Sequence, residues 1–179
     1  MKIHINLSAS SLDEAIKKVE NYKKSISDKA LKTCDKLADY GVEYAQKEIS
    51  AMADYGNLTD IKNSIHKEQR GNKFYIVTRN IKAPFVEFGT GVRGSGNAHP
   101  EASQFGWGYM TGNFTEYNGK VGWWYPSTLG DGNITQKETE SGDLIAFTQG
   151  MPARPFMYNT AKAVKRRAKE TTKEVMGKK

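Results

Sequence analysis

The chain has 179 residues, a formal net charge of +7, 37% hydrophobic residues and a mean hydropathy of −0.68. This length suits a single domain, residues 1–179, and the small hydrophobic fraction predicts an elongated shape or surface that is buried only in an assembly. The absence of an 18-residue apolar run excludes an ordinary membrane-spanning helix. The lone Cys34 excludes an internal disulfide and suits a reducing compartment.

The charges are unevenly placed along the chain. Residues 10–52 carry eight lysines and eight acidic residues, whereas 94–150 carry two lysines and six acidic residues. Residues 162–179 carry eight basic residues against Glu170 and Glu174. An acidic middle and a basic end favour contacts with copies or neighbouring proteins over general nucleic-acid binding.

The first third of the chain is predicted to be mainly helical. Alternating apolar residues at 2–7 predict a short strand. A capping-box pattern that starts at Ser11 then opens a helix, whose apolar positions recur every three or four residues as far as Met52. An unbroken helix of that length would measure about 60 Å. We therefore expect one long kinked helix or two helices, over about 11–24 and 28–52.

A hairpin and a one-turn helix are predicted next. Residues 60–69 and 73–80 have the pattern of two strands, joined by a turn at Arg70–Asn72. Pro84 and Gly89 then bound a single helical turn. Proline fits a first helical turn, and glycine can adopt the left-handed conformation that ends one.

The segment 92–150 is rich in glycine and aromatic residues. We interpret it as an insertion of β-hairpins that begins with a flexible exit from the preceding turn. Alternating residues at 105–109 and 121–125 predict one pair of strands around a loop. Residues 133–137 and 144–148 predict a second pair.

The last predicted helix begins at Pro155. Its apolar positions have helical spacing, and they are Met157, Ala161, Val164, Ala168, Thr171 and Val175. The alanines would let this helix lie close to the N-terminal helix. The predicted fold class is α+β, with the long N-terminal helix (or two) and the C-terminal helix packed on a small antiparallel sheet.

Chemistry-bearing residues are few. The sequence lacks phosphate-binding glycine loops and the HExxH, CxxC and GxSxG motifs. Glu87 lies between phenylalanines and could act as an acid or base, but no second acid, nucleophile or metal ligand stands near it in sequence. The structural alternative is that it pairs with an arginine or accepts backbone N–H bonds. His99 could bind a metal, yet the three histidines lack ligand spacing. We expect no catalytic residue, metal site or cofactor.

Three tryptophans, Trp107, Trp123 and Trp124, allow three interpretations. They could stack on bases or sugars, form the local core of the hairpins, or line a protein interface. Because Trp123 and Trp124 are neighbours on a predicted strand, they should point to opposite faces. At least one of them is therefore expected outside the hairpin core.

The C-terminal helix has a basic row at helical spacing, formed by Lys162, Arg166, Lys169 and Lys173. A solvated helix face is the simplest interpretation. Contact with DNA phosphates is an alternative, and so is contact with an acidic protein surface such as the insertion of an adjacent copy.

Two short boxes carry a resemblance to a known family. They are Val86-Glu87-Phe88-Gly89-Thr90-Gly91 and Pro152-Ala153-Arg154-Pro155-Phe156-Met157. With the order helix, hairpin, turn and helix, they resemble the tail-completion, or head–tail joining (neck), proteins of long-tailed bacteriophages. The resemblance covers residues 10–91 and 150–176. The connection between the boxes is longer here than in many members.

The resemblance implies a virion protein without enzymatic activity. Such proteins form a ring, here expected to hold six copies, and help to join the tail to the DNA-filled head. The implied partners are connector, tail-terminator or tail-tube proteins, with DNA contact not required and no membrane. The implied location is the virion neck, after assembly in the host cytoplasm.

One structural hypothesis follows from the two boxes, and two other functions are considered beside the virion role. We expect the boxes to act as a structural motif in which Glu87 pairs with Arg154, pinning the turn to the last helix. A small basic nucleic-acid-binding protein using the C-terminal helix is the alternative function. An enzyme such as a cell-wall hydrolase is suggested only by the aromatic residues and a lone Glu and His.

Overall fold

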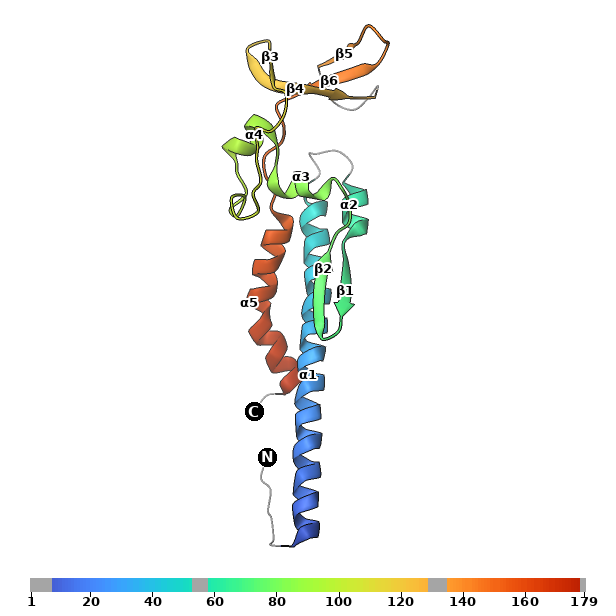
Figure 1. Ribbon diagram of the computed structural model, residues 1–179, viewed down its shortest axis with the longest axis vertical. Coiled ribbons are helices and arrows are strands. Elements are labelled where there is room, and N and C mark those ends of the chain that lie inside the picture. Colours follow the sequence, from blue (N-terminus) through green and yellow to red (C-terminus); the bar gives the residue numbers. More distant parts are fainter. Residues whose placement is uncertain (1–7, 53–57, 129–134, 178–179) are drawn as a thin grey trace.

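The structure is a computed structural model that describes residues 8–52, 58–128 and 135–177. The strand predicted at 2–7 lies outside the described residues. The molecule is elongated, with helix α1 (Ala9–Ser50) along its long axis and a small β-sheet at the far end (Figure 1). Its helices and small antiparallel sheets confirm the predicted α+β class.

Helix α1 is one helix of 42 residues, so the alternative of two helices is wrong. The side chain of Ser8 caps its start by accepting a hydrogen bond from the backbone N–H of Ser11. Ser25 and Asp28, which could have capped a second helix, lie within the helix. The sequence has no proline between residues 9 and 50 to break it.

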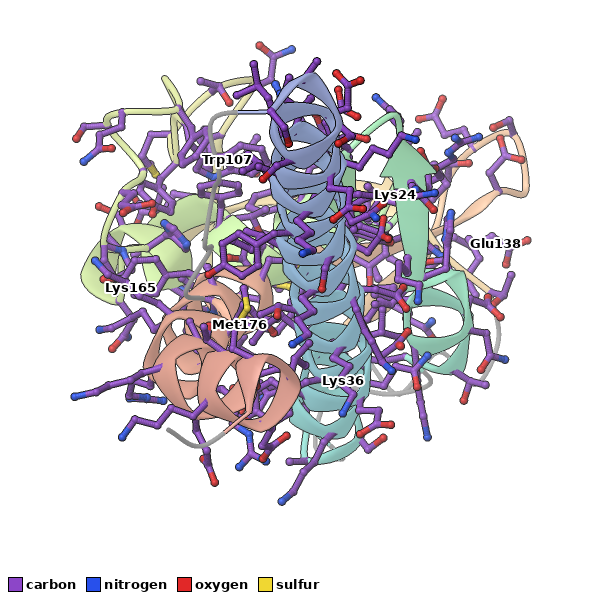
Figure 2. All side chains as sticks on the ribbon, turned by 90° about the horizontal axis from the view of Figure 1, so that it is seen from below. Lys24, Lys36, Trp107, Glu138, Lys165 and Met176 are labelled. Carbon is purple, nitrogen blue, oxygen red and sulfur yellow. The ribbon has the colours of Figure 1, made fainter. Side chains whose placement is uncertain are left out.

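Helix α5 (Phe156–Met176) runs back along α1, as predicted (Figure 1). Viewed along α1, α5 lies on one side and the β1–β2 hairpin on another (Figure 2). The buried face of α5 includes Thr160, Ala163 and Thr171, small side chains that allow close approach. Ala161 is exposed, so the predicted apolar stripe of α5 is shifted around the helix.

The segment predicted as a strand at 60–69 begins instead with helix α2 (Thr59–Ser64). Ile61 and Ile65, four residues apart, are both buried, which explains why helical spacing prevails over strand alternation. Strand β1 (His66–Arg70) then pairs with β2 (Lys73–Val77) in an antiparallel hairpin.

The hydrophobic core lies where the end of α1, α2, helix α3 (Ala83–Phe88) and the start of α5 meet. Its buried members are Ala45, Ile49, Ile61, Ile65, Ala83, Val86 and Phe156. The predicted one-turn helix that ends at Gly89 is confirmed as α3. The core therefore joins the two helices to the segment that carries the first box.

The insertion contains a four-stranded antiparallel sheet in the order β3–β4–β6–β5. Its strands are β3 (Thr115–Tyr117), β4 (Lys120–Pro126), β5 (Gln136–Glu138) and β6 (Leu144–Thr148). The predicted pairing of β5 and β6 is confirmed within the described residues. This sheet lies beyond α3 and helix α4 (Gly91–Gly96), separate from the β1–β2 sheet (Figure 1).

The other predicted pairing, of 105–109 with 121–125, is wrong. Strand β4 pairs with β3 across the turn at Asn118–Gly119, and with β6 on its other side. Residues 105–109 instead pack on the boxes, as described below. The expected flexible exit is also wrong, because Gly91–Gly96 form a short helix, α4.

Within the described residues, no helix has a stretch long and apolar enough to cross a membrane.

Glu68 on β1 provides a test of the hairpin. The guanidinium of Arg70, 2.6 Å away, lowers the pKa of Glu68 to about 2 against the opposing effect of burial, with help from Arg79. The folded pKa is depressed, so this stabilisation is present above about pH 4.5 and lost as the pH falls through about 2. Arg70→Gln should raise the pKa of Glu68, measured by carboxyl NMR titration, and Arg166→Gln should leave it unchanged. A wild-type value near 4.5 would contradict this account.

Candidate functional site

The two boxes are joined directly by backbone hydrogen bonds. The N–H of Thr90 donates to the carbonyl of Met151 at 2.8 Å, and the N–H of Met151 donates back at 3.1 Å. The N–H of Arg154 donates to the carbonyl of Val86 at 2.9 Å. We call this pair of segments, residues 86–91 and 151–158, the joint.

Gly89 allows the two segments to approach this closely. Its φ is +76°, a conformation that side chains other than hydrogen rarely permit. A Cβ at this position would lie 2.5 Å from the backbone nitrogen of Ala153 and 2.7 Å from the oxygen of Met151. Both the conformation and the space therefore require glycine.

The Glu87 carboxylate caps helix α5 from a distant part of the chain. Its Oε2 accepts from the N–H of Met157 at 2.8 Å, and its Oε1 accepts from the N–H of Tyr158 at 2.9 Å. Pro155 stands at the N-cap of α5, and its side chain has no atom that could accept these bonds. A buried carboxylate also complements the positive end of the helix dipole. Glu87 thus replaces a local capping residue.

His99 completes the surroundings of Glu87. The N–H of Glu101 donates to Nδ1 of His99 at 3.0 Å, so the hydrogen-bond network assigns the ring proton to Nε2. That Nε2–H donates to Oε1 of Glu87 at 3.1 Å. The His99 backbone N–H donates to the hydroxyl of Tyr109 at 2.8 Å. Both ring nitrogens and the carboxylate are therefore engaged in holding the joint together.

The expected pair between Glu87 and Arg154 is wrong in its partner. Within the described chain no ion pair within 4.0 Å joins Glu87 to Arg154, and the carboxylate instead accepts from Nε2–H of His99 and from two backbone N–H groups of α5. Arg154 contributes to the joint through its backbone N–H. The backbone N–H groups at the start of α5 supply the positive pole beside the carboxylate.

Aromatic side chains cover the joint. Phe88 stacks on Trp107 with ring centroids 5.0 Å apart and lies 4.4 Å from the ring of His99. The indole N–H of Trp107 donates to the carbonyl of Gly89 at 3.0 Å. Phe156 is fully buried in the core beneath. Trp107 therefore holds the turn and is only partly available as an interface residue.

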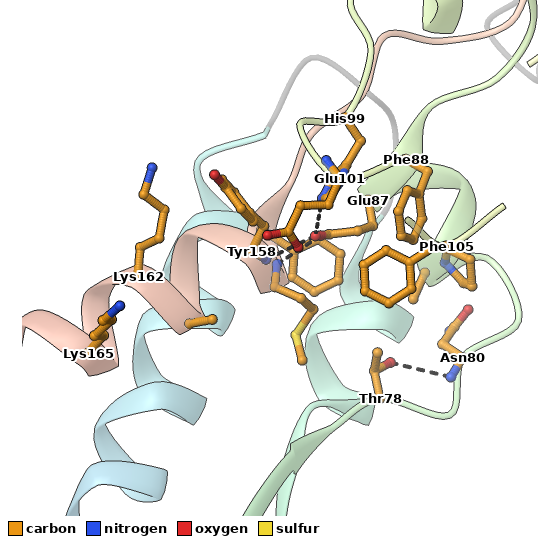
Figure 3. Close-up of a pocket in the computed structure, with 15 residues that line it drawn as sticks. Thr78, Asn80, Glu87, Phe88, His99, Glu101, Phe105, Tyr158, Lys162 and Lys165 are labelled. Carbon is orange, nitrogen blue, oxygen red and sulfur yellow. Dashed lines mark hydrogen bonds and ion pairs between the residues drawn. The ribbon is translucent and has the colours of Figure 1, made fainter. Parts of the chain in front are cut away.

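A pocket of about 500 Å³ opens beside Glu87 (Figure 3). Its apolar lining includes Pro84, Phe88, Phe105 and Phe156, and Lys162 and Lys165 also line it. The hydroxyl of Thr78, another lining residue, is 2.6 Å from that of Ser64. The pocket thus combines an apolar wall, nearby lysines and a histidine–carboxylate pair engaged in structural hydrogen bonds. Its mainly apolar lining suits an apolar group.

The other two tryptophans point to opposite faces of β4, as predicted. Trp123 contacts Phe114, with ring centroids 5.5 Å apart. Trp124 packs with Tyr117 and Phe147 in the insertion sheet. These two residues lie apart from the pocket beside Glu87.

The basic residues lie mainly outside the joint. Lys162 lies over the ring of Tyr158 at 4.9 Å. The other three predicted basic residues, Arg166, Lys169 and Lys173, are on the exposed side of α5. Among the residues that the structure describes, no cluster of His, Cys, Asp and Glu could hold a metal ion.

Sequence reasoning missed the role of His99, whereas the alternative that Glu87 accepts backbone N–H bonds is confirmed at the start of α5. The spacing of these residues gives no signal of their contact. A usable signal was the start of α5, where Pro155 and Phe156 replace the usual capping residues. A helix that begins in this way lacks a local side-chain acceptor, so a buried start needs one from elsewhere in the chain.

Comparisons of this chain with protein-family models, with curated proteins and with solved structures found no match.

Removing the carboxylate of Glu87 should destabilise the fold. Glu87→Gln keeps the shape but turns one end of the group into a donor that faces N–H donors, so unfolding should become about 2–4 kcal/mol easier. Urea titration followed by circular dichroism measures this change. The matched control Glu170→Gln removes an exposed ion pair with Arg167 and should cost less than about 0.5 kcal/mol. Equal losses in the two variants would contradict the capping role.

Gly89→Ala should destabilise the chain by more than about 2 kcal/mol, because strain and backbone clash add together. Gly71 also has a positive φ, but a Cβ there meets no described heavy atom within 4 Å. Gly71→Ala should therefore cost only about 1 kcal/mol. Gly96→Ala, where space is also open, should be near neutral. Thermal unfolding of the three variants tests this order, and a Gly89→Ala protein as stable as Gly96→Ala would refute it.

Proposed function

We propose that this protein is a structural component of the head–tail joint of a long-tailed phage or prophage virion. As a tail-completion or neck protein, it would form a ring and help to join the tail to the DNA-filled head. It would act in the virion neck, after assembly in the host cytoplasm. The neighbouring connector, tail-terminator or tail-tube proteins would be its partners.

The observation that carries this proposal is the meeting of the two boxes. Thr90 and Met151 are 61 residues apart, yet their backbones are hydrogen-bonded to each other. The Glu87 carboxylate then ties the first box to the helix that follows the second. The segments that carry the family resemblance thus form a single structural unit.

The chemistry and surface of the molecule also support a role in assembly. The histidine–carboxylate pair is occupied by structural hydrogen bonds. Large apolar side chains are exposed at several places, including Ile81 at 82% and Phe105 at 66%. Contiguous exposed apolar surface, such as the row of large side chains from Leu12 to Ile26 on α1, is typical of proteins that bury it against neighbours.

Nucleic-acid binding remains the second candidate, and the exposed face of α5 favours it. Five cations lie on this face: Lys162, Lys165, Arg166, Lys169 and Lys173. On the described part of α5, Glu170 and Glu174 form ion pairs with Arg167, which is not a member of this basic row. Salt-sensitive binding of purified protein to duplex DNA, lost when this row is neutralised, would favour this function.

Deletion of the gene from its phage or prophage tests the leading proposal. We expect DNA-filled heads and complete tails that remain unjoined in electron micrographs. The wild-type gene supplied from a plasmid should restore joined particles, and mass spectrometry should detect the protein in purified virions. Normal virions after deletion would overturn the proposal. Particles arrested as empty heads would instead assign the protein to an earlier packaging step.

A further inference from the structure

One face of α5 carries cations without acids. At about 100° per residue, an arc of about 100° contains five exposed cations, which are Lys162, Lys165, Arg166, Lys169 and Lys173. The acids of α5, Glu170 and Glu174, lie outside this arc and pair with Arg167. Within the described chain, no ion pair within 4.0 Å includes any of the five cations. We call this arc the basic face.

The basic face begins at the edge of the pocket beside Glu87. Lys162 and Lys165 line this pocket of about 500 Å³, and the rings of Phe88 and Phe105 lie on its other side (Figure 3). The Phe105 side chain is 66% exposed, so its ring is accessible to a ligand that enters the pocket. An apolar cavity and a cationic surface therefore meet at one place.

Two acids also line the pocket, but cations remain in excess. The Glu87 carboxylate already accepts from two N–H groups of α5 and from His99. Glu101 is the other acid. With both acids counted, the pocket and the basic face together hold five cations against two acids. A ligand that covers both surfaces therefore meets a positive field, which favours carboxylates or phosphates.

The wall of the pocket decides between these two kinds of anion. Besides the two rings, its apolar lining includes Ala83, Pro84, Phe156, Met157 and Ala161. The Thr78 hydroxyl is 2.6 Å from that of Ser64, and Oδ1 of Asn80 accepts from the N–H of Lys82 at 2.9 Å. A nucleobase placed here would find few partners for the polar atoms of its edges, which is costly on burial. An aromatic or large aliphatic side chain has no such requirement.

We propose that the pocket and the basic face together bind a segment of a partner protein in which an aromatic or large aliphatic side chain is flanked by acidic residues. The apolar side chain enters the pocket beside Phe88 and Phe105, and the carboxylates lie along α5 on the basic face. Burial of the apolar side chain supplies most of the affinity, and the charges orient the segment. The inference goes beyond the neck function and does not depend on it.

Designed peptides test both parts of the proposal on the full chain. The probe is a fluorescein-labelled peptide with one tryptophan between two runs of glutamates, and fluorescence anisotropy measures its binding. One matched peptide has alanine for the tryptophan, and another has glutamines for the glutamates. Each should bind at least about tenfold more weakly than the probe, because it loses either apolar burial or charge pairing. Equal binding of the three peptides, or no binding of the probe, would overturn the proposal.

Variants of the chain locate the binding surface. Lys162→Gln/Lys165→Gln and Phe105→Ser should each weaken binding of the probe about tenfold, with thermal unfolding close to wild type because these side chains are exposed. The matched control, Lys17→Gln/Lys24→Gln, removes the same charge from exposed positions of α1 and should bind the probe like wild type. Equal losses in the two lysine variants would show an effect of net charge alone and overturn the site.

A labelled oligonucleotide, single-stranded or duplex, separates this partner from nucleic acid. At about 0.15 M salt it should bind more weakly than the probe. Tighter binding of the oligonucleotide that is lost in Lys162→Gln/Lys165→Gln would assign the basic face to nucleic acid and overturn the proposal. Because these measurements use purified protein, normal virions after gene deletion would contradict the neck function and leave this site unaffected.

Discussion

The structure depends on one carboxylate placed at the start of one helix. Glu87 accepts the first free N–H groups of α5, which Pro155 cannot cap, and it also accepts the ring N–H of His99. These bonds fix where α5 begins and therefore how it lies along α1. Because the groups are buried, losing the acceptor would leave several donors without partners. A single acidic residue thus connects the turn, the histidine loop and the last helix.

The same joint explains how a long insertion is accommodated. The insertion begins after Gly91 and ends at Gly150, and a Cβ at Gly150 would lie 2.0 Å from the carbonyl oxygen of Thr90. The two ends of the insertion therefore lie side by side, and its sheet extends beyond the helices and the β1–β2 hairpin (Figure 1). An insertion with adjacent ends can change in length with little effect on the core that supports it.

The sequence predicted the parts of the fold that depend on local pattern. The α+β class, the helix α3 ending at Gly89, the β5–β6 pair and the opposite faces of Trp123 and Trp124 all follow from periodicity and turn residues. It also singled out Glu87. The wrong predictions concern features that depend on tertiary contacts. Trp107 packs on the joint and is not paired in a sheet. His99 is hydrogen-bonded to Glu87, twelve residues away in sequence. Such contacts leave no periodic signal.

Continuity of α1 has a mechanical consequence. A helix of 42 residues is about 63 Å long. The C-terminal end of α1 packs in the core with Val86 and Phe156. Its other end carries the exposed apolar side chains between Leu12 and Ile26. Since no hinge interrupts the helix, a tilt of about 5° at the joint would displace the projecting end by about 5 Å. Small changes in the packing around Glu87 would therefore move the N-terminal end of α1 by several times the change at the core.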